Sequence, residues 1–120
     1  MTRILNLTQH LASPAQTEAG VFEPDDKAAV QAALTFNTLP TEDDLCEAAV
    51  ALTEICEAEG AGIAMIGGAP FFMKTLEDCL AMNGILAVYA FSVRESADVP
   101  QPDGSVRKVA VFRHLGFVGM

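Results

Sequence analysis

The chain is poor in basic residues and has no long hydrophobic run. Of its 120 residues only 7 are Lys or Arg, whereas 16 are Asp or Glu, which gives a net charge of −9. Duplex DNA or RNA needs many Lys and Arg side chains to neutralise its phosphates, so we expect no such partner. No apolar run reaches the roughly 18 residues of a membrane span, and the N-terminal stretch lacks the features of a signal peptide. We therefore expect a cytoplasmic protein that does not bind a membrane.

Cysteine is also scarce, and familiar catalytic motifs are missing. Cys46, Cys56 and Cys79 lack the paired spacing of a zinc or redox site, so we expect them to be small core residues. The sequence contains no GxSxG, HExxH or CxxC motif. The acidic triplet Glu42-Asp43-Asp44 lies where a helix is expected to begin, and acids there interact favourably with the helix dipole. We therefore expect neither a metal site nor a cofactor.

What the chain does have is a high apolar content and an uneven distribution of charge. Hydrophobic residues make up 51% of the sequence and charged residues 19%, which indicates a folded chain whose length suits one domain, residues 1–120. Residues 18–59 contain eleven acids and one base, a net charge of −10, whereas the remaining residues contain five acids and six bases, a net charge of +1. The acidity therefore belongs to one region, and the others are able to hold a compact anion.

Apolar patterning and turn residues predict alternating strands and helices. Strands are expected over residues 3–7, 62–66 and 85–91. Helices are expected over residues 24–34, 42–59 and 70–82. A polar loop follows the first strand, and the turn Pro102-Asp103-Gly104 joins residues 92–99 to residues 106–118 as a hairpin. We predict an α/β fold: a single three-layer Rossmann-like domain with a mainly parallel sheet and a C-terminal β-hairpin.

Polar segments follow the three predicted strands, and ligands of parallel sheets bind at these carboxyl ends. Thr8-Gln9-His10 follows the first strand, and its imidazole is suited to proton transfer near neutral pH, although it is equally compatible with an ordinary surface histidine. Gly67-Gly68-Ala69 follows the second strand and precedes a helix, where backbone N–H groups favour an anion. The alternative for the glycines is a tight strand-to-helix turn.

The third segment, Ser92–Ser96, begins the predicted hairpin. Alternation along a strand places Arg94 on the same side as Ser92 and Ser96, so that a guanidinium and two hydroxyls face one phosphate. The alternative is an ion pair of Arg94 with Glu95 or Asp98. Arg94 is also one of four basic residues in the tail, and such residues commonly protect a sheet edge. The other three are Arg107, Lys108 and Arg113.

Two stretches resemble the small CRISPR-associated CARF-like proteins of type III systems. One is Thr8-Gln9-His10 with Ser13-Pro14-Ala15-Gln16, and the other covers about the last 32 residues. The matching tail motifs are Tyr89-Ala90-Phe91-Ser92, Arg94-Glu95, Pro102-Asp103-Gly104-Ser105-Val106, Lys108, Val111-Phe112, Arg113-His114 and Phe117. The loop from Met65 to Pro70 also resembles uncharacterised phage and prophage proteins.

The resemblance implies an antiviral-defence protein that binds cyclic oligoadenylate, with ring nucleases among its relatives. In a metal-independent ring nuclease a ribose 2′-hydroxyl attacks its own phosphate, and the protein positions the ring and assists proton transfer. We assign His10 and Lys108 as catalytic residues. The ligand-binding residues are Thr8, Gln9, Gly67, Gly68, Ala69, Ser92, Arg94 and Ser96.

A symmetric ring favours a two-fold homodimer, which we expect as the oligomeric state. Two alternative functions remain open at this point. One is a non-enzymatic module that senses a nucleotide without cleaving it. The other is a phage accessory protein whose hairpin mediates dimerisation.

Overall fold

The computed structural model describes residues 2–119, which form four helices and a mixed five-stranded sheet. The strand order is β2-β1-β3-β4-β5. The strands are β1 (Ile4–Leu7), β2 (Val21–Phe22), β3 (Ile63–Ile66), β4 (Leu86–Pro100) and β5 (Val106–Val118). The first four in this order run parallel, whereas β5 pairs antiparallel with β4. The predicted α/β class is confirmed.

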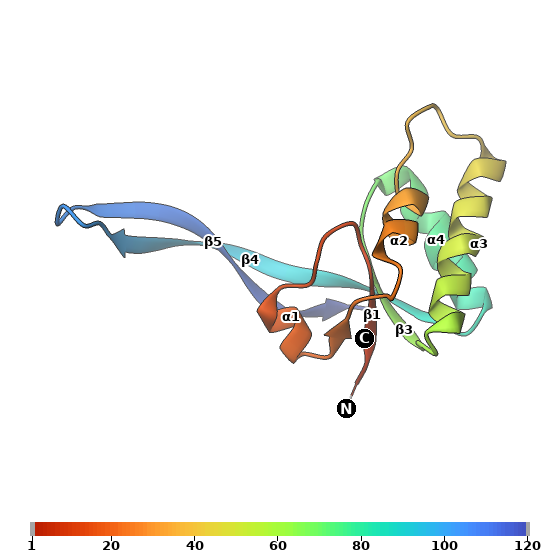
Figure 1. The fold of residues 1–120 in the computed structure, drawn as a ribbon, viewed down its shortest axis with the longest axis horizontal. Coiled ribbons are helices and arrows are strands. Elements are labelled where there is room, and N and C mark those ends of the chain that lie inside the picture. The colour runs from red at the N-terminus through yellow and green to blue at the C-terminus, as the bar shows by residue number, and fades with distance from the viewer. Residues whose placement is uncertain (1, 120) are drawn as a thin grey trace.

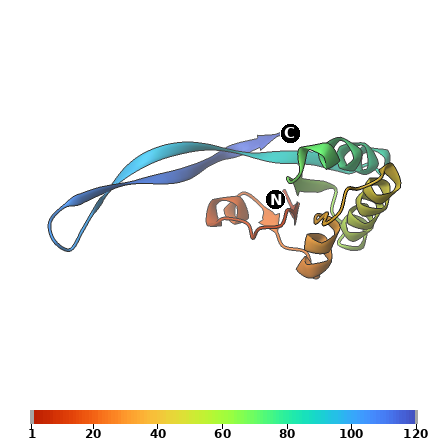
Figure 2. The same ribbon diagram turned by 90° about the horizontal axis from the view of Figure 1, so that it is seen from above.

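The helices divide unequally between the two faces of the sheet (Figures 1 and 2). They are α1 (Pro14–Glu18), α2 (Lys27–Ala33), α3 (Glu42–Ala58) and α4 (Pro70–Met82). Leu5, Leu7 and Ile66 of the sheet share the main core with side chains of α2, α3 and α4. A smaller cluster contains Met65 and Val88 and lies on the side of α1. None of the helices within residues 2–119 is long and apolar enough to cross a membrane.

Local signals in the sequence explain where two of the helices begin. The Thr41 side chain accepts a hydrogen bond from the N–H of Asp44, and the Asp44 carboxylate accepts one from the N–H of Thr41, a capping box that starts α3. Pro70 occupies the first turn of α4, where its missing N–H is not needed. The predicted helices over residues 42–59 and 70–82 are therefore confirmed to within one residue at each end.

Other boundaries in the N-terminal third differ from the prediction. The helix expected from residue 24 begins at Lys27, because the Asp26 side chain caps it by accepting from the N–H of Ala29 at 3.0 Å. Residues 14–18, where no helix was predicted, form α1, which begins with the capping box of Ser13 and Gln16. The strand β2 has only two residues, too few for an alternation pattern to be visible in the sequence.

The expectation that all three cysteines lie in the core is wrong for one of them. Cys56 is buried, and burial raises the pKa of its thiol to about 12, with the Glu57 carboxylate adding to the shift. Cys79 is half-buried and its sulfur accepts a hydrogen bond from the hydroxyl of Thr53, whereas Cys46 is exposed on α3. The helical periodicity of apolar residues predicts the buried face of α3 only approximately, and Cys46 lies just outside that face.

A single strand, β4, contains both the strand predicted over residues 85–91 and the run 92–99, and it has a bulge between Phe91 and Ser92. Beyond this bulge the β4–β5 pair leaves the sheet and projects far from the rest of the molecule (Figures 1 and 2). We call residues 91–116 the arm and the remaining residues the body. The arm accounts for much of the 56 Å long axis of the molecule.

Candidate functional site

A pocket opens at the carboxyl ends of β1 and β3, beside the residues of β4 that follow its pairing with β3, where the sequence predicted a site. Its volume is about 510 Å³, within the roughly 300–1,000 Å³ of ligand-binding clefts. It is lined by Thr8, Gln9, His10, Leu11, Ser13, Gln16, Met65, Ile66, Gly67, Gly68, Tyr89 and Ala90. A second hollow of about 520 Å³ lies between α2 and α3, but Asp44 and Glu47 line it and would repel an anion. The first pocket is therefore the candidate site.

The loop that carries His10 is fixed by three side chains of the body. Asn6 is fully buried, and its amide N–H groups donate to the His10 carbonyl at 2.8 Å and to the Glu23 carboxylate at 3.0 Å. Its amide oxygen accepts from the N–H and the hydroxyl of Thr8. The Lys27 ammonium donates to the carbonyls of Thr8 and His10 at 2.7 and 2.9 Å. The main chain of the loop is therefore held in place by side chains of the body.

Glu23 is the charged member of this network, and its environment acts on its pKa in both directions. Burial, the largest single influence, acts to raise the pKa of Glu23. Hydrogen bonds from the Ala12 N–H, Asn6 and Lys27, together with the positive charge of Lys27, outweigh burial and lower it. Glu23 therefore stays ionised at neutral pH and holds both partners.

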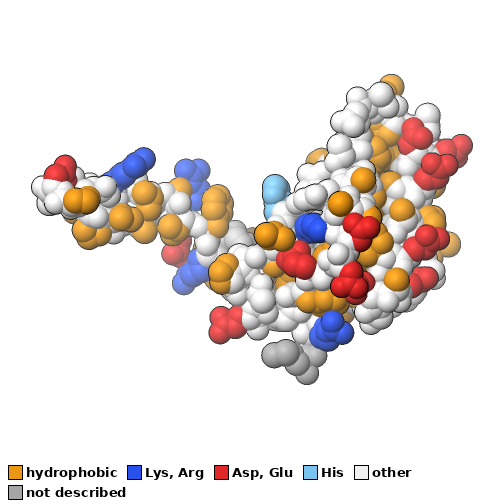
Figure 3. All heavy atoms as spheres, viewed as in Figure 1, with side chains coloured by type: hydrophobic (Ala, Val, Ile, Leu, Met, Phe, Trp, Pro, Cys, Tyr) orange, Lys and Arg blue, Asp and Glu red, His pale blue; other side chains and the backbone are white. Residues whose placement is uncertain are grey.

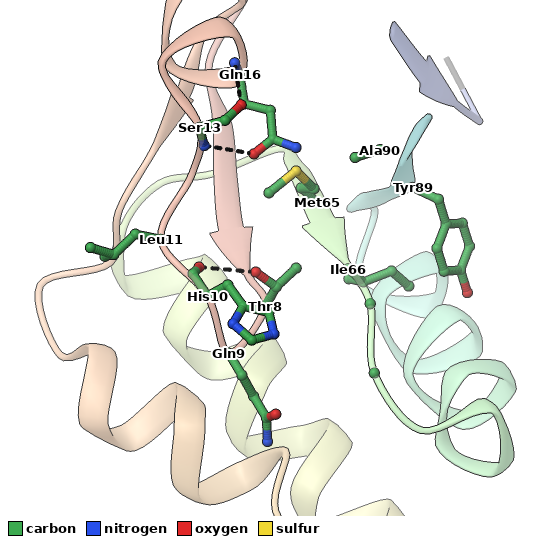
Figure 4. Close-up of a pocket in the computed structure, with 12 residues that line it drawn as sticks. Thr8, Gln9, His10, Leu11, Ser13, Gln16, Met65, Ile66, Tyr89 and Ala90 are labelled. Carbon is green, nitrogen blue, oxygen red and sulfur yellow. Dashed lines mark hydrogen bonds between the residues drawn. The ribbon is translucent and has the colours of Figure 1, made fainter. Parts of the chain in front are cut away.

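The side chains of the loop divide between the pocket and the solvent (Figure 4). The His10 ring lies in the gap between the loop and the end of β3, whereas Leu11 points away from it and is 74% exposed. Gln9 donates to the Thr35 hydroxyl at 3.2 Å, and its carbonyl accepts from Gln31, which ties the loop to α2. The imidazole is therefore the group of this loop best placed for proton transfer.

The opposite wall of the pocket is the turn from β3 into α4. Gly68 has φ of +152°, a conformation that other residues rarely adopt. No side chain caps α4, whose N-cap residue is Ala69. Pro70 has no N–H and the N–H of Phe72 donates to the Ala69 carbonyl, so the N–H groups of Ala69 and Phe71 remain for solvent or an anion. The predicted glycine turn is thus present, and both of its interpretations, a tight turn and an anion contact, agree with this geometry.

Tyr89 and Ala90 of β4 complete the pocket. Burial raises the pKa of Tyr89 to about 12, and the nearby negative charge of Glu77 acts in the same direction. Tyr89 is therefore a neutral phenol at physiological pH. His10 is the one histidine among the residues that line the pocket, and none of the others is Asp, Glu, Lys, Arg or Cys.

The structure brings together only part of the predicted site within one chain. Thr8, Gln9, His10, Gly67 and Gly68 line the pocket, and Ala69 lies beside it as the N-cap of α4. Four predicted residues belong instead to the arm. They are Ser92, Arg94, Ser96 and Lys108. At about 3.3 Å per residue, Arg94 lies about 13 Å beyond Ala90, and Lys108, which pairs with Asp98, lies about 26 Å beyond it.

The arm residues nevertheless have the predicted orientation. The register pairs Ser92, Arg94 and Ser96 with His114, Phe112 and Ala110, which confirms that the first three share one face. Glu95 forms its ion pair with Arg113, at 2.9 Å, and not with Arg94. Within residues 2–119 neither Arg94 nor Lys108 takes part in an ion pair.

Sequence reasoning missed the residues that hold the loop. Asn6 is a polar residue within an apolar strand. Because a buried amide must be hydrogen-bonded, this position could have indicated a buried hydrogen-bond network. Glu23 and Lys27 looked like ordinary surface charges of the acidic region. Their four-residue separation was the only sign that they interact.

The described residues 2–119 contain no group of three or more His, Cys, Asp or Glu side chains placed to hold a metal ion. Comparison with protein families gives one informative result: residues 2–118 match the model of the family described as "Uncharacterized protein MJ1673 family". The match covers nearly the whole chain, so it includes both the body and the arm. No curated protein and no solved structure matches the chain significantly.

Proposed function

This chain belongs to the Uncharacterized protein MJ1673 family, and we propose that its pocket binds a small anionic nucleotide. The proposal treats the fold as three-layer and Rossmann-like, with α1 as the sparse outer layer opposite α2, α3 and α4. In open sheets of this kind ligands bind beyond the carboxyl ends of the strands. The observation that carries the proposal is the meeting, at one pocket, of the carboxyl ends of β1 and β3 with Tyr89 and Ala90, which follow the part of β4 that pairs with β3.

Two features of the pocket support an anionic ligand. The uncapped start of α4 offers N–H groups at the positive end of a helix dipole, next to the glycine turn. Asn6 and Lys27 hold the main chain of the loop 8–11 in place, and the loop presents the His10 imidazole at the pocket. The Thr8 hydroxyl and the Gln9 amide are already hydrogen-bonded within the body. Such a pocket is ready to bind before the ligand arrives, which reduces the entropic cost of binding.

Cyclic oligoadenylate is the ligand that the resemblance suggests, and a metal-independent ring nuclease is the activity. In that reaction the ribose 2′-oxygen attacks the adjacent phosphorus, the bond to the 5′-oxygen breaks, and a 2′,3′-cyclic phosphate remains. The 2′-hydroxyl loses one proton and the leaving 5′-oxygen gains one. His10 would carry out one of these transfers, and the N–H groups of the glycine turn would stabilise the added negative charge.

Binding without cleavage is the second candidate, and one observation favours it. General acid–base catalysis of this reaction moves two protons, yet the residues that line the pocket include one histidine, His10, and no Asp, Glu, Lys or Cys beside it. A non-enzymatic nucleotide sensor needs no second group. The two candidate functions therefore share one binding site and differ only in whether the bound ring is cleaved.

A binding measurement tests the shared part of the proposal. Cyclic tetra-adenylate at 100 times its dissociation constant should stabilise the protein by about 2.7 kcal/mol, seen as a rise in Tm. His10→Ala should weaken this effect, whereas Leu39→Ala, at an exposed residue that does not line the pocket, should preserve it. No shift at millimolar ligand would contradict a cyclic nucleotide site.

Incubation of the protein with the same ring in EDTA then separates the two candidates. A nuclease should yield linear products, and His10→Ala should lower turnover by about a hundredfold or more. A ring that remains intact after hours at micromolar protein, with binding preserved, identifies the sensor instead.

A further inference from the structure

The short helix α1 places one of its side chains at the pocket. Four of its five residues are exposed, whereas Gln16 is half-buried and lines the pocket. The N-cap residue of the same helix, Ser13, lines the pocket too. These two residues form the capping box of α1, so the start of this helix is part of the pocket wall.

The capping box fixes which end of the Gln16 amide faces the pocket. The N–H of Ser13 donates to the Gln16 Oε1 at 3.0 Å, and the N–H of Gln16 donates to the Ser13 hydroxyl oxygen at 3.2 Å. Because an N–H pairs only with the oxygen of an amide, the NH2 end of Gln16 points away from Ser13. In Figure 4 this nitrogen points toward the side of the pocket where Met65 and Ala90 lie.

Both side chains of the capping box use an oxygen to accept from the main chain and keep their protons. Among residues 2–119 the NH2 group of Gln16 has no hydrogen-bond acceptor, and the hydroxyl proton of Ser13 has none either. The two side chains therefore offer the pocket several hydrogen-bond donors. A ligand group rich in acceptor oxygens is the complement of such a surface.

The charge of the body makes direct hydrogen bonds necessary for an anion. The body holds three of the seven Lys and Arg residues and thirteen acids, a net charge of −10, whereas the arm holds four bases and three acids, a net charge of +1. In Figure 3 most of the acidic side chains in view cover the body. Long-range attraction by the body therefore does not bring an anion to this pocket, and fixed donors have to hold it.

The segment that carries the capping box is held in place by the body. The N–H of Ala12, which precedes the N-cap residue, donates to the Glu23 carboxylate at 2.9 Å. Asn6 and Lys27 hold this carboxylate in turn, and the Lys27 ammonium, 3.3 Å away, offsets its negative charge. Donors that are fixed before a ligand arrives lose little conformational entropy when they bind it.

We propose that Gln16 and Ser13 form a phosphate subsite of the pocket, in which the amide and the hydroxyl donate to oxygens of one phosphate group. The inference rests on the proposed function, because it places a phosphate of the nucleotide within the same pocket. A phosphate offers several acceptor oxygens and no N–H donor, whereas an adenine edge presents a donor beside an acceptor. The subsite lies across the pocket from the start of α4, so a ligand with more than one phosphate is able to use both walls.

Inorganic pyrophosphate, which has phosphate oxygens and no base, tests the subsite directly on the full chain. In nitrogen–proton correlation NMR spectra the side-chain NH2 signals of Gln16 should move downfield during the titration. Those of Gln101, whose amide donates to the Val99 carbonyl on the arm, should stay in place. Adenosine, which has a base and no phosphate, should move neither. A Gln16 signal that ignores pyrophosphate well above the millimolar range, or that responds to adenosine alone, would overturn the proposal.

A substitution at Gln16 separates phosphate binding from helix capping. Gln16→Glu keeps an oxygen for the N–H of Ser13, so the capping box and the Tm should be preserved, but a negative charge replaces the donor. The affinity for pyrophosphate and for cyclic tetra-adenylate should fall by about tenfold or more, as expected when a hydrogen bond to a charged group is lost. Gln101→Glu adds the same charge on the arm and should leave both affinities unchanged.

The two ligands distinguish failure of this inference from failure of the proposed function. If cyclic tetra-adenylate binds and Gln16→Glu leaves its affinity unchanged, the pocket binds the nucleotide without this subsite, and the inference is overturned. If pyrophosphate moves the Gln16 signals while cyclic tetra-adenylate does not bind, the phosphate subsite is supported and the cyclic nucleotide is the wrong ligand.

Discussion

The body and the arm are built differently, although the same two strands run through both. In β4, Val88 is fully buried in the body, whereas Phe91, three residues later and at the start of the arm, is 50% exposed. The body surrounds its strands with helices and has a net charge of −10, whereas the arm leaves both of its faces open and has a net charge of +1. The difference indicates that the body supplies the stability of the fold and that the arm exists to contact something else.

The largest expected effect comes from cutting a side chain out of the core of the body. Phe72→Ala removes a fully buried ring of α4 that packs against Phe36, and should lower the free energy of unfolding by about 3–5 kcal/mol. Phe112→Ala, the matched change on the arm, removes a ring that is 75% exposed and should change it by no more than about 0.5 kcal/mol. Urea denaturation of both variants provides the measurement, and similar losses would erase the distinction between the two regions.

A smaller effect is expected where the body fixes the His10 loop. Asn6→Ala removes the amide that bonds Glu23, the His10 carbonyl and Thr8, and should cost about 1–3 kcal/mol of unfolding free energy although Lys27 still bonds the first two. Asn37→Ala, at an exposed site, is the control and should be nearly neutral. Faster hydrogen exchange at residues 8–12 in Asn6→Ala would show that the loop has loosened, and an unaltered loop would remove Asn6 from its support.

The pH dependence of this network should be weaker but specific. The pKa of Glu23 is lower in the folded protein than its ordinary value of 4.5, so the unfolded chain binds a proton more readily. Its contribution to stability is therefore present above that ordinary value and is lost as the pH falls through the lowered pKa. Between neutral pH and pH 3, wild type should lose more stability than Glu23→Gln; parallel curves from thermal unfolding would contradict this.

The smallest effect is expected for an ion pair of the arm. Glu95 and Arg113 are 2.9 Å apart, but their side chains are 45% and 62% exposed. A double-mutant cycle with Glu95→Gln and Arg113→Gln should give a coupling energy below about 1 kcal/mol, and salt should reduce it. A coupling energy well above about 1 kcal/mol would mean that these two side chains are buried against another surface.

The sequence predicted those parts of the fold that depend on local signals. Thr41 with Asp44 and Pro70 mark the starts of α3 and α4, and the apolar runs mark β1 and β3. The order of strands and loops in the sequence predicted at which edge of the sheet the pocket lies. Its residues from β1 and β3 were therefore predicted, although their roles in binding stay predictions.

The missing parts depend on contacts between distant residues. Glu23 bonds Asn6 across 17 positions, which no local pattern reveals. The placement of Arg94 and Lys108 was wrong because the hairpin was expected to lie close to the sheet, whereas β4 extends over 15 residues, past the bulge at Phe91 and Ser92, and projects away from the body. The sequence pattern did not reveal that the arm projects from the body, because apolar and polar residues alternate along it as they do in a strand that is covered on one face.

Hydrogen exchange followed at several protein concentrations tests most directly whether the arm has a partner. Amides of the arm that pair β4 with β5, such as those from residues 93–99, are compared with amides of β1 and β3 in the same sample. Because an isolated hairpin opens easily, the account predicts that protection of the arm rises with concentration, while protection of the body stays constant. Arm amides that exchange rapidly at every concentration up to the millimolar range would contradict it.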